Sequence, residues 1–186
     1  MGKSTHARLL CAHLEQRGLP WLSLREPGGS SFSERLRALF LQEGLDHMTE
    51  LLLVLASRRE NITKIIEPAL AEGKVVVIDR FIDSTLVYQG VLGNLGLEKT
   101  RELMNLTGTW LEPDLTFIMD IDSGHSLARI VPGDKFENQG PEYHRKIRRS
   151  FLDLAVDKRH VIINSDRKRD EVARDIREKV DAVITA

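Results

Sequence analysis

The sequence predicts a doubly wound α/β domain, in which helices cover both faces of a parallel sheet. Two observations support this class. Residues 75–78 form an unbroken β-branched run, Val-Val-Val-Ile, which is typical of a strand buried on both faces of a parallel sheet. Short apolar runs of this kind also alternate with longer amphipathic segments along the 186 residues, a length that suits one domain.

Four segments have the length and composition of buried strands: residues 19–24, 75–78, 115–120 and 160–164. The connections between them are long enough to contain helices, so we expect the strands to run parallel. Apolar residues at helical spacing predict helices from the N-terminus to Gly18 and at residues 33–42, 49–72, 98–106, 123–130, 141–158 and 171–184. The apolar faces include Leu36, Leu39, Phe40, Leu52, Leu55, Ile62, Ile66, Leu70, Val172, Ile176, Val180 and Val183.

Composition excludes several classes of protein. A formal net charge of −1 argues against nucleic-acid binding through bulk charge. Cys11 is the only cysteine, so neither an internal disulfide nor a thiolate metal cluster is expected, and we interpret Cys11 as a small buried side chain. No apolar run reaches the roughly 18 residues of a membrane span, and no secretory signal opens the chain. We therefore expect a cytoplasmic protein without membrane contact.

The chain opens with Met1-Gly2-Lys3-Ser4-Thr5 and continues into the first predicted helix. Gly-Lys-Ser is the closing half of a phosphate-binding loop, in which backbone N–H groups at a helix N-terminus surround a phosphate. In such a loop the lysine reaches the β- and γ-phosphates and the following hydroxyl ligates Mg²⁺. Taken alone, these letters are weak evidence, and a polar, frayed N-terminus is the preferred interpretation of them.

Polar residues follow the strand at residues 75–78. Asp79 and Arg80 stand at its carboxyl end, which is the edge where open α/β sheets bind ligands. Ser84, Thr85, Tyr88 and Gln89 follow at helical spacing and give the next helix a polar face. An ordinary surface pair of an acid and a base is the alternative, less favoured interpretation of Asp79 and Arg80 when they are taken alone.

Two further segments are candidates for the same cleft. Arg25-Glu26-Pro27-Gly28-Gly29-Ser30 is a turn that can bring backbone close to a ligand, although a plain tight turn explains it equally well. Arg58 and Arg59 lie where the apolar pattern of residues 49–72 turns polar. Such a pair usually lies on a solvated face, as we expect for Arg145, Lys146, Arg148 and Arg149, but it can also hold a phosphate or a carbonyl.

Taken together, these motifs resemble those of bacterial thymidylate kinases. The matching segments are GKST (2–5), LREPGGS (24–30), LASR (55–58), DRFIDSTLVYQG (79–90), PDLTFIMDID (113–122) and DKFEN (134–138), in the order found in that family. The resemblance covers essentially the whole chain and implies a P-loop nucleoside monophosphate kinase fold over residues 1–186, a single domain with a lid at about 130–140. It also implies transfer of the γ-phosphoryl group of ATP to dTMP with Mg²⁺, in a homodimer.

The resemblance also implies roles for individual residues. The ATP-binding residues would be Gly2, Lys3, Ser4 and Thr5, with Lys3 on the β/γ-phosphates and Ser4 on Mg²⁺. Arg80 would bind the phosphate of dTMP and Asp79 would position Mg²⁺ or its water. Arg58 would hydrogen-bond the thymine ring, and the rest of the dTMP pocket would be formed by Arg25, Val54, Ser84, Tyr88 and Gln89. Arg129 and Lys135 would neutralise charge on the transferred phosphoryl group, since phosphoryl transfer depends on positioning and cationic stabilisation.

The chain departs from the family pattern at three places. Val54 stands where the family usually has a phenylalanine that stacks on the base, so we expect weaker stacking. Lys135 replaces the usual lid arginine and lacks its planar fork of donors. Family members also carry about ten more residues before GKST, which form a central strand and the first half of the phosphate loop, so this strand is missing from the chain. We therefore expect that Met1 is not the true start.

Two alternatives remain open at this stage. One is another nucleoside monophosphate kinase, although adenylate kinases typically show Gly-Lys-Gly-Thr and the REPGG segment argues against them. The other is a truncated, catalytically impaired protein that binds dTMP but has little affinity for ATP. Measuring the binding of both ligands distinguishes them, because the impaired protein should retain only dTMP.

Overall fold

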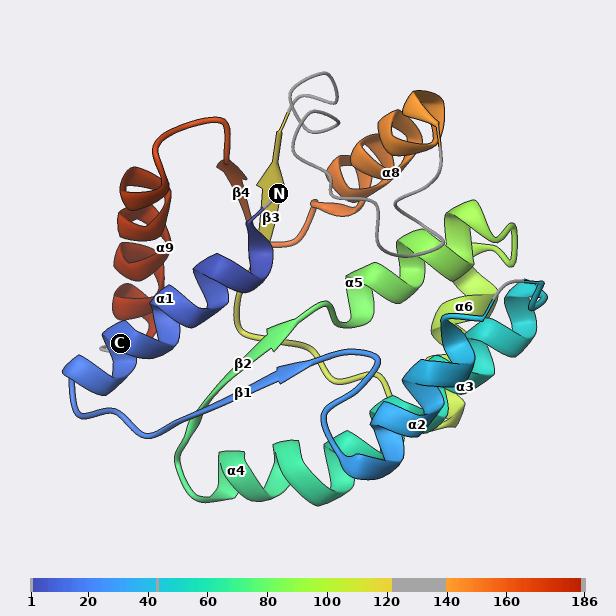
Figure 1. Ribbon diagram of the computed structural model, residues 1–186, viewed down its shortest axis with the longest axis horizontal. Helices are drawn as coiled ribbons and strands as arrows, with labels where there is room; N and C mark the ends of the chain where they lie inside the picture. Colours follow the sequence, from blue (N-terminus) through green and yellow to red (C-terminus); the bar gives the residue numbers. More distant parts are fainter. Residues whose placement is uncertain (1, 43, 122–139, 185–186) are drawn as a thin grey trace. The chain divides into compact units, whose positions relative to one another are not determined.

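The computed structural model describes residues 2–42, 44–121 and 140–184 (Figure 1). It confirms all four predicted strands, which form two parallel pairs: β1 (Trp21–Arg25) with β2 (Val75–Asp79), and β3 (Thr116–Asp120) with β4 (His160–Asn164). The chain divides into two compact units. Unit 2 is Leu14–Leu111, and unit 1 combines Met1–His13 with Glu112–Ala186.

Unit 2 contains the β1–β2 pair and the helices around it. These are α2 (Ser31–Phe40), α3 (His47–Asn61), the π-helix η1 (Ile62–Ile66), α4 (Glu67–Ala71), α5 (Ile82–Thr85), the π-helix η2 (Leu86–Leu92) and α6 (Leu97–Leu106). Helix α2 packs against α3, and α4 packs against β2. The predicted long helix at 49–72 is therefore one helical run that contains a π-helical segment.

The core of unit 2 is centred on α3 and on the helices that follow β2. Its buried apolar side chains include Leu51, Val54, Leu55, Ile62, Ile66, Ile82, Leu86, Val87 and Met104. The prediction was wrong for Leu39, Leu52 and Leu70, which are 46%, 53% and 48% exposed. On α3 the buried side chains are instead those of Leu51 and Leu55. The π-helical turn η1 contains more residues per turn than an α-helix, so it changes the direction in which the side chains after it, including Leu70, point.

The strands are less buried than the sequence predicts. Every residue of β2 is half-buried, and in β3 only Ile118 is buried. Within the described part of the chain each of these strands pairs with one neighbour, so each has one edge without a strand. The unpaired edge accounts for the incomplete burial of both strands.

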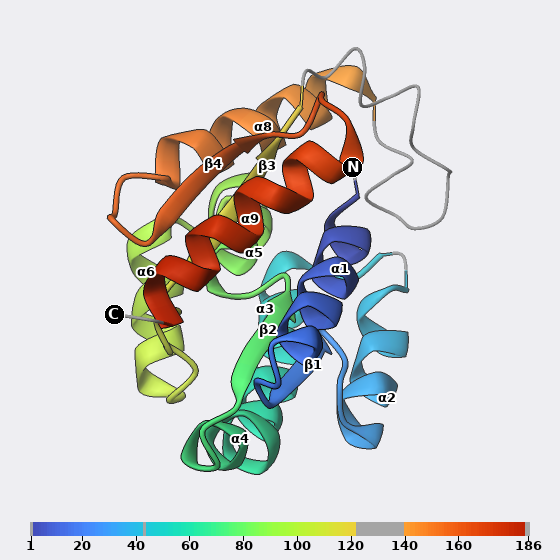
Figure 2. The ribbon, with the colours of Figure 1, turned by 90° about the vertical axis from the view of Figure 1, so that its left-hand side faces the viewer.

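Unit 1 contains the β3–β4 pair, which lies between α8 (Pro141–Leu154) and α9 (Arg169–Ile184) in both ribbon views (Figures 1 and 2). Helix α1 (Lys3–Gln16) contributes its first residues to this unit, where the His13 Nε2 atom lies 2.9 Å from Asp181 Oδ1 on α9. Cys11 is buried, as predicted. The predicted helix at 123–130 lies outside the described residues, as do residues 130–139 of the predicted lid.

Arg148 does not lie on a purely solvated face, which corrects the prediction for that residue of α8. Its guanidinium pairs with the Asp120 carboxylate at the end of β3, with Nε–Oδ1 and Nη2–Oδ2 distances of 2.6 and 2.9 Å. The two hydrogen bonds from Arg148 hold the pKa of Asp120 below its usual range. Arg145, Lys146 and Arg149 are exposed.

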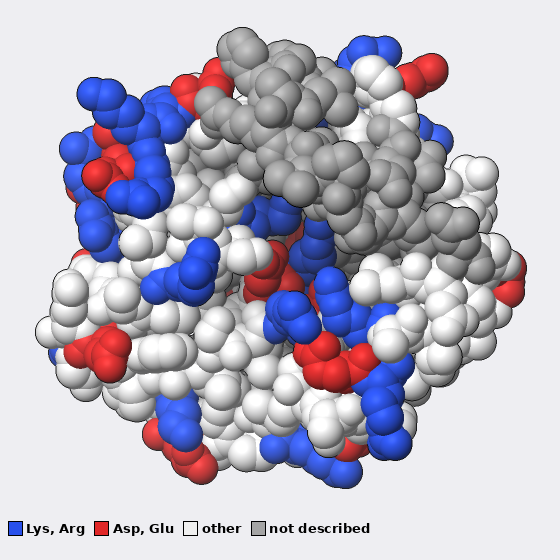
Figure 3. Space-filling model, viewed as in Figure 1, with Lys and Arg blue, Asp and Glu red and all other residues white. Residues whose placement is uncertain are grey.

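Two further observations concern the charges on the surface and the hydrophobicity of the helices. Positive and negative side chains are interspersed on the face shown in Figure 3, which agrees with the net charge of −1. Among the described helices, none is both long enough and apolar enough to cross a bilayer.

Candidate active site

The carboxyl ends of β1 and β2 bring charged residues to one edge of unit 2. Arg25 and Asp79 are directly opposite in the parallel register. The Glu26 N–H then donates to the Asp79 carbonyl at 3.0 Å, so the pairing extends one residue beyond β1. The two predicted segments therefore meet at one edge of the sheet, the edge at which open α/β sheets bind ligands.

Arg80 leaves the end of β2 in a left-handed conformation, with φ = +68°. This conformation is strained for a long side chain and is frequent at functional sites. The Arg80 Nη1 atom donates to the Tyr88 hydroxyl at 3.1 Å, and the guanidinium carbon lies 5.2 Å from the centre of the Tyr88 ring. Tyr88 thus orients Arg80 at the edge of the sheet.

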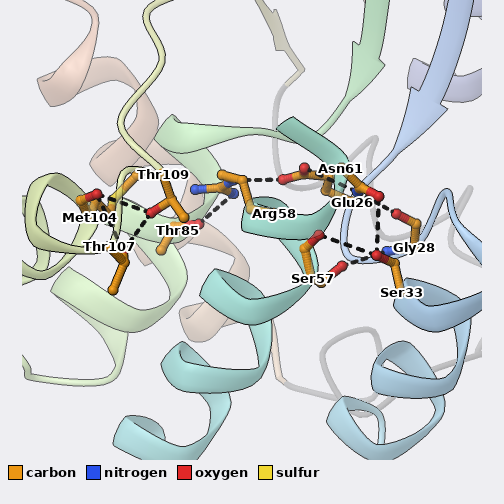
Figure 4. Close-up of polar contacts among 10 residues, drawn as sticks. All are labelled: Glu26, Gly28, Ser33, Ser57, Arg58, Asn61, Thr85, Met104, Thr107 and Thr109. Carbon is orange, nitrogen blue, oxygen red and sulfur yellow. Dashed lines mark hydrogen bonds and ion pairs between the residues drawn. The ribbon is translucent and has the colours of Figure 1, made fainter. Parts of the chain in front are cut away.

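Arg58 is the most buried charged side chain of the site, with 1% of its surface exposed. Its Nε donates to Glu26 Oε2 at 2.6 Å and its Nη2 donates to Thr85 Oγ1 at 2.9 Å (Figure 4). The guanidinium also lies over the Phe81 ring, 4.8 Å from its centre. The third nitrogen, Nη1, is buried and finds no acceptor among the described residues.

Gln89 presents a second donor of the same kind. Its side chain is 2% exposed, and its Nε2 atom is buried without a hydrogen-bond partner among the described residues. Gln89 lies in η2, and π-helical turns frequently occur at functional sites. Val54 is 5% exposed and precedes Arg58 by one turn of α3, and Ser84 is half-buried on α5.

Arg25 lies at the same edge but already has a partner. Its Nη2 donates to Glu34 Oε2 at 2.9 Å, and both side chains are exposed. The Gly29 N–H donates to the other Glu34 oxygen at 3.0 Å. The hydrogen bonds from Gly29 and Arg25 lower the pKa of Glu34, so this carboxylate stays charged and keeps Arg25 paired at neutral pH.

The Gly-Lys-Ser segment opens α1 in unit 1. Gly2 has φ = +66° and its carbonyl accepts from the His6 N–H at 2.9 Å, which starts the helix. Lys3, Ser4 and Thr5 form the first turn, where backbone N–H groups and the helix dipole favour a phosphate. Arg129 and Lys135 lie outside the described residues.

Sequence reasoning missed several contributors to the site. The Arg58 guanidinium contacts Glu26, Thr85 and Phe81. Asn61 and Ser33 belong to the same buried hydrogen-bond network. Glu26 and Thr85 stand inside the two most specific motifs, so their position was the available signal. In unit 1, burial and the nearby Arg169 lower the pKa of His6.

An edge of parallel strands that carries charged side chains is the place where open α/β sheets bind their ligands. Comparison with known proteins identifies the family. Residues 1–176 match the family model for thymidylate kinase. The chain belongs to the thymidylate kinase family.

Individual relatives agree with this assignment. The chain is 40% identical to a thymidylate kinase of Symbiobacterium thermophilum, over 98% of this chain and 89% of the relative. It is 43% identical to one from Synechococcus sp. (strain JA-3-3Ab), over 89% of this chain and 82% of the relative. The crystal structure of a thymidylate kinase from Ehrlichia chaffeensis superposes with a TM-score of 0.77 at 31% identity, covering 96% of this chain and 92% of that one. Both the expected fold class and the expected family are therefore confirmed, and the chain is a phosphotransferase acting on dTMP.

Proposed function

We propose that this chain transfers the γ-phosphoryl group of ATP to dTMP and releases ADP and dTDP. The observation that carries the proposal is the pair of buried donors, Arg58 Nη1 and Gln89 Nε2, that lack partners among the described residues. A buried donor left unpaired costs about 1–3 kcal/mol, so a site with two of them favours a ligand that supplies two acceptors. The carbonyl oxygens of thymine are such acceptors.

This donor pair supports discrimination between pyrimidines. Thymine carries a carbonyl at ring position 4, whereas cytosine carries an amino group, which donates. An amino group facing Arg58 would place two donors against each other in a buried site. We therefore propose a strong preference for dTMP over dCMP. The preference over dUMP rests on one methyl group and is worth only about 1–3 kcal/mol.

The phosphate of dTMP is proposed to bind Arg80. The hydrogen bond from Arg80 to Tyr88 supports this role, because it holds the guanidinium at the carboxyl end of β2 before any ligand arrives. Arg25 and Ser84 are proposed to complete the pocket. For Arg25 this requires exchanging Glu34 for the nucleotide, which its exposed position allows.

The phosphate donor is proposed to be ATP, bound by Gly2, Lys3, Ser4 and Thr5. The Ser4 hydroxyl and the Asp79 carboxylate are each an oxygen donor of the kind that Mg²⁺ prefers, which supports their proposed roles as ligands of this ion. Bound Mg²⁺ would neutralise charge on the transferred phosphoryl group. Arg129 and Lys135 remain the proposed additional cations, and water exclusion by a lid at about 130–140 remains a prediction.

A homodimer in the cytoplasm, built from one domain per chain, is also proposed from the family. The exposure of Leu52 on α3 supports an interface on that helix, because an apolar side chain 53% exposed can be covered by a second copy. Binding of nucleic acid or of a membrane is not part of the proposal.

The test is ADP release from ATP and Mg²⁺ with a panel of acceptors: dTMP, dUMP, dCMP, AMP and CMP. The proposal predicts the fastest release with dTMP and the largest loss on replacing it with dCMP or AMP. Equal rates with dTMP and dCMP would contradict the donor argument. Binding of dTMP without ADP release, in a folded protein, would instead indicate a nucleotide-binding protein without activity.

A further inference from the structure

A buried polar network joins the turn after β1 to the end of α3 (Figure 4). Its central side chain is Asn61, which is 0% exposed. The Asn61 amide nitrogen donates to the Gly28 carbonyl at 2.7 Å and to Glu26 Oε1 at 3.3 Å. The Asn61 amide oxygen accepts from the Ser33 hydroxyl at 3.0 Å. Both donor positions of the amide are thus used inside the protein, so Asn61 does not need a ligand to be satisfied.

The Glu26 carboxylate connects Asn61 to Arg58. One oxygen accepts from Asn61, and the other accepts from Arg58 Nε at 2.6 Å. Glu26 is 2% exposed, so water does not compete for either oxygen. With one oxygen held by the amide and the other by the guanidinium, the carboxylate plane is fixed, and this direction in turn fixes Arg58.

We propose that Asn61 is a positioning residue for nucleotide recognition. It acts through Glu26 and keeps the Arg58 guanidinium in the orientation that leaves Nη1 available to the base, while Asn61 itself touches no substrate. The inference rests on the proposed function, because it assigns Arg58 Nη1 to the bound base. It adds that one hydrogen-bond network links the turn after β1 to the base-binding arginine, so that the two move together.

The glycines of the turn agree with this assignment. Gly28 and Gly29 have φ values of +133° and +112°, which L-residues with a side chain rarely adopt. A Cβ atom on Gly29 would lie 3.2 Å from Asn61 Oδ1 and 3.3 Å from Asn61 Nδ2. The turn therefore leaves room for the amide of Asn61, and the Gly28 carbonyl points to it.

The test replaces Asn61 and compares the result with a buried threonine whose hydroxyl bonds to Met104 and Thr107. Asn61→Ala removes all three contacts, and Asn61→Ser retains a hydroxyl in case the alanine variant does not fold. Thr109→Val is the matched control: Thr109 is also 0% exposed in unit 2, and its hydroxyl donates to the Met104 carbonyl at 3.1 Å. Both positions should lower the Tm, since each loses a buried hydrogen bond.

Three readouts separate positioning from a purely structural role. For the Asn61 variants we expect the dTMP Kd and KM to rise roughly 10- to 100-fold, as for a misplaced binding group, with the ATP KM unchanged. The preference for dTMP over dCMP should fall by a similar factor. The Arg58 Nε–H signal in nitrogen-15 NMR should exchange faster with water, in the absence of any substrate. Thr109→Val should change none of these.

Each outcome decides the inference. Asn61 variants that match Thr109→Val in dTMP affinity, in selectivity and in Arg58 exchange would overturn it. If wild-type protein fails to bind dTMP, the proposed function is wrong, while the exchange readout still reports whether Asn61 holds Arg58. Faster Arg58 exchange with unchanged dTMP affinity would show that the guanidinium becomes more mobile without any effect on nucleotide binding. This result would also overturn the positioning role.

Discussion

Replacing Gln89 with methionine should stabilise the protein and weaken dTMP binding at the same time. Gln89 is 2% exposed, and its amide nitrogen has no partner among the described residues. Methionine has a similar length and no donor, so it fills the same space without an unpaired N–H group. A residue kept for folding alone would not carry this cost.

The expected magnitudes follow from that unpaired group. Burying it costs about 1–3 kcal/mol, so Gln89→Met should raise the free energy of unfolding by about 1 kcal/mol or more. For a chain of this size, about 1 kcal/mol corresponds to a rise in Tm of roughly 2–4 °C. The variant then leaves a thymine carbonyl unpaired in the complex, which should weaken dTMP binding by roughly 5- to 150-fold.

The assay is thermal unfolding of wild type and variant, with and without dTMP, followed by calorimetric titration of dTMP. Without ligand the variant should melt higher, and with dTMP the wild type should gain more, because ligand binding to the folded state raises Tm. Gln16→Met is the control, since Gln16 is an exposed glutamine at the end of α1. It should alter neither Tm nor affinity. A Gln89→Met protein that melts lower, or that binds dTMP as tightly as wild type, would refute the reasoning.

Further variants test other parts of the structure. Val54→Phe should tighten dTMP binding in calorimetry by about 0.5–1.5 kcal/mol through ring stacking. It should also lower Tm, since Val54 is 5% exposed and a larger side chain forces its neighbours to shift. Glu26→Gln should lower the free energy of unfolding in urea by about 3–5 kcal/mol, because it leaves the buried Arg58 cation without its carboxylate. Asp120→Asn should lower it by only about 0.2–1 kcal/mol at pH 7, since Arg148 is partly exposed. Arg148 depresses the Asp120 pKa, so the stabilisation is complete above the usual value of 3.8, and the difference between wild type and variant should shrink as pH falls below it.

The sequence was sufficient to predict the strands and the polar edge of unit 2. Residues 75–78 are all β-branched, and an acid and a base follow them directly. The sequence therefore predicted both the strand and the charged residues at its carboxyl end. Arg58 was identified because LASR stands at a fixed place in the motif order. The absence of a partner for Arg58 Nη1 was not predictable, because it depends on which groups from two other segments reach the guanidinium.

Burial was the least predictable property. Glu26 follows the exposed Arg25, and nothing in the local pattern indicates that it is 2% exposed and paired with Arg58. Carboxylates are almost never buried without a partner, and this partner lies 32 residues away. The π-helical turns η1 and η2 were missed for a related reason, because a pattern of period 3.6 assumes a regular α-helix. The exposure of Leu70 after η1 is the visible consequence.

The most direct test of the account follows the phosphoryl group itself. Wild-type protein is incubated with Mg²⁺, ATP labelled at the γ-phosphate, and an equimolar mixture of dTMP and dCMP, and the products are separated by chromatography. The account predicts that the label appears in dTDP, with little in dCDP. Label found equally in both diphosphates, or only in inorganic phosphate, would contradict it.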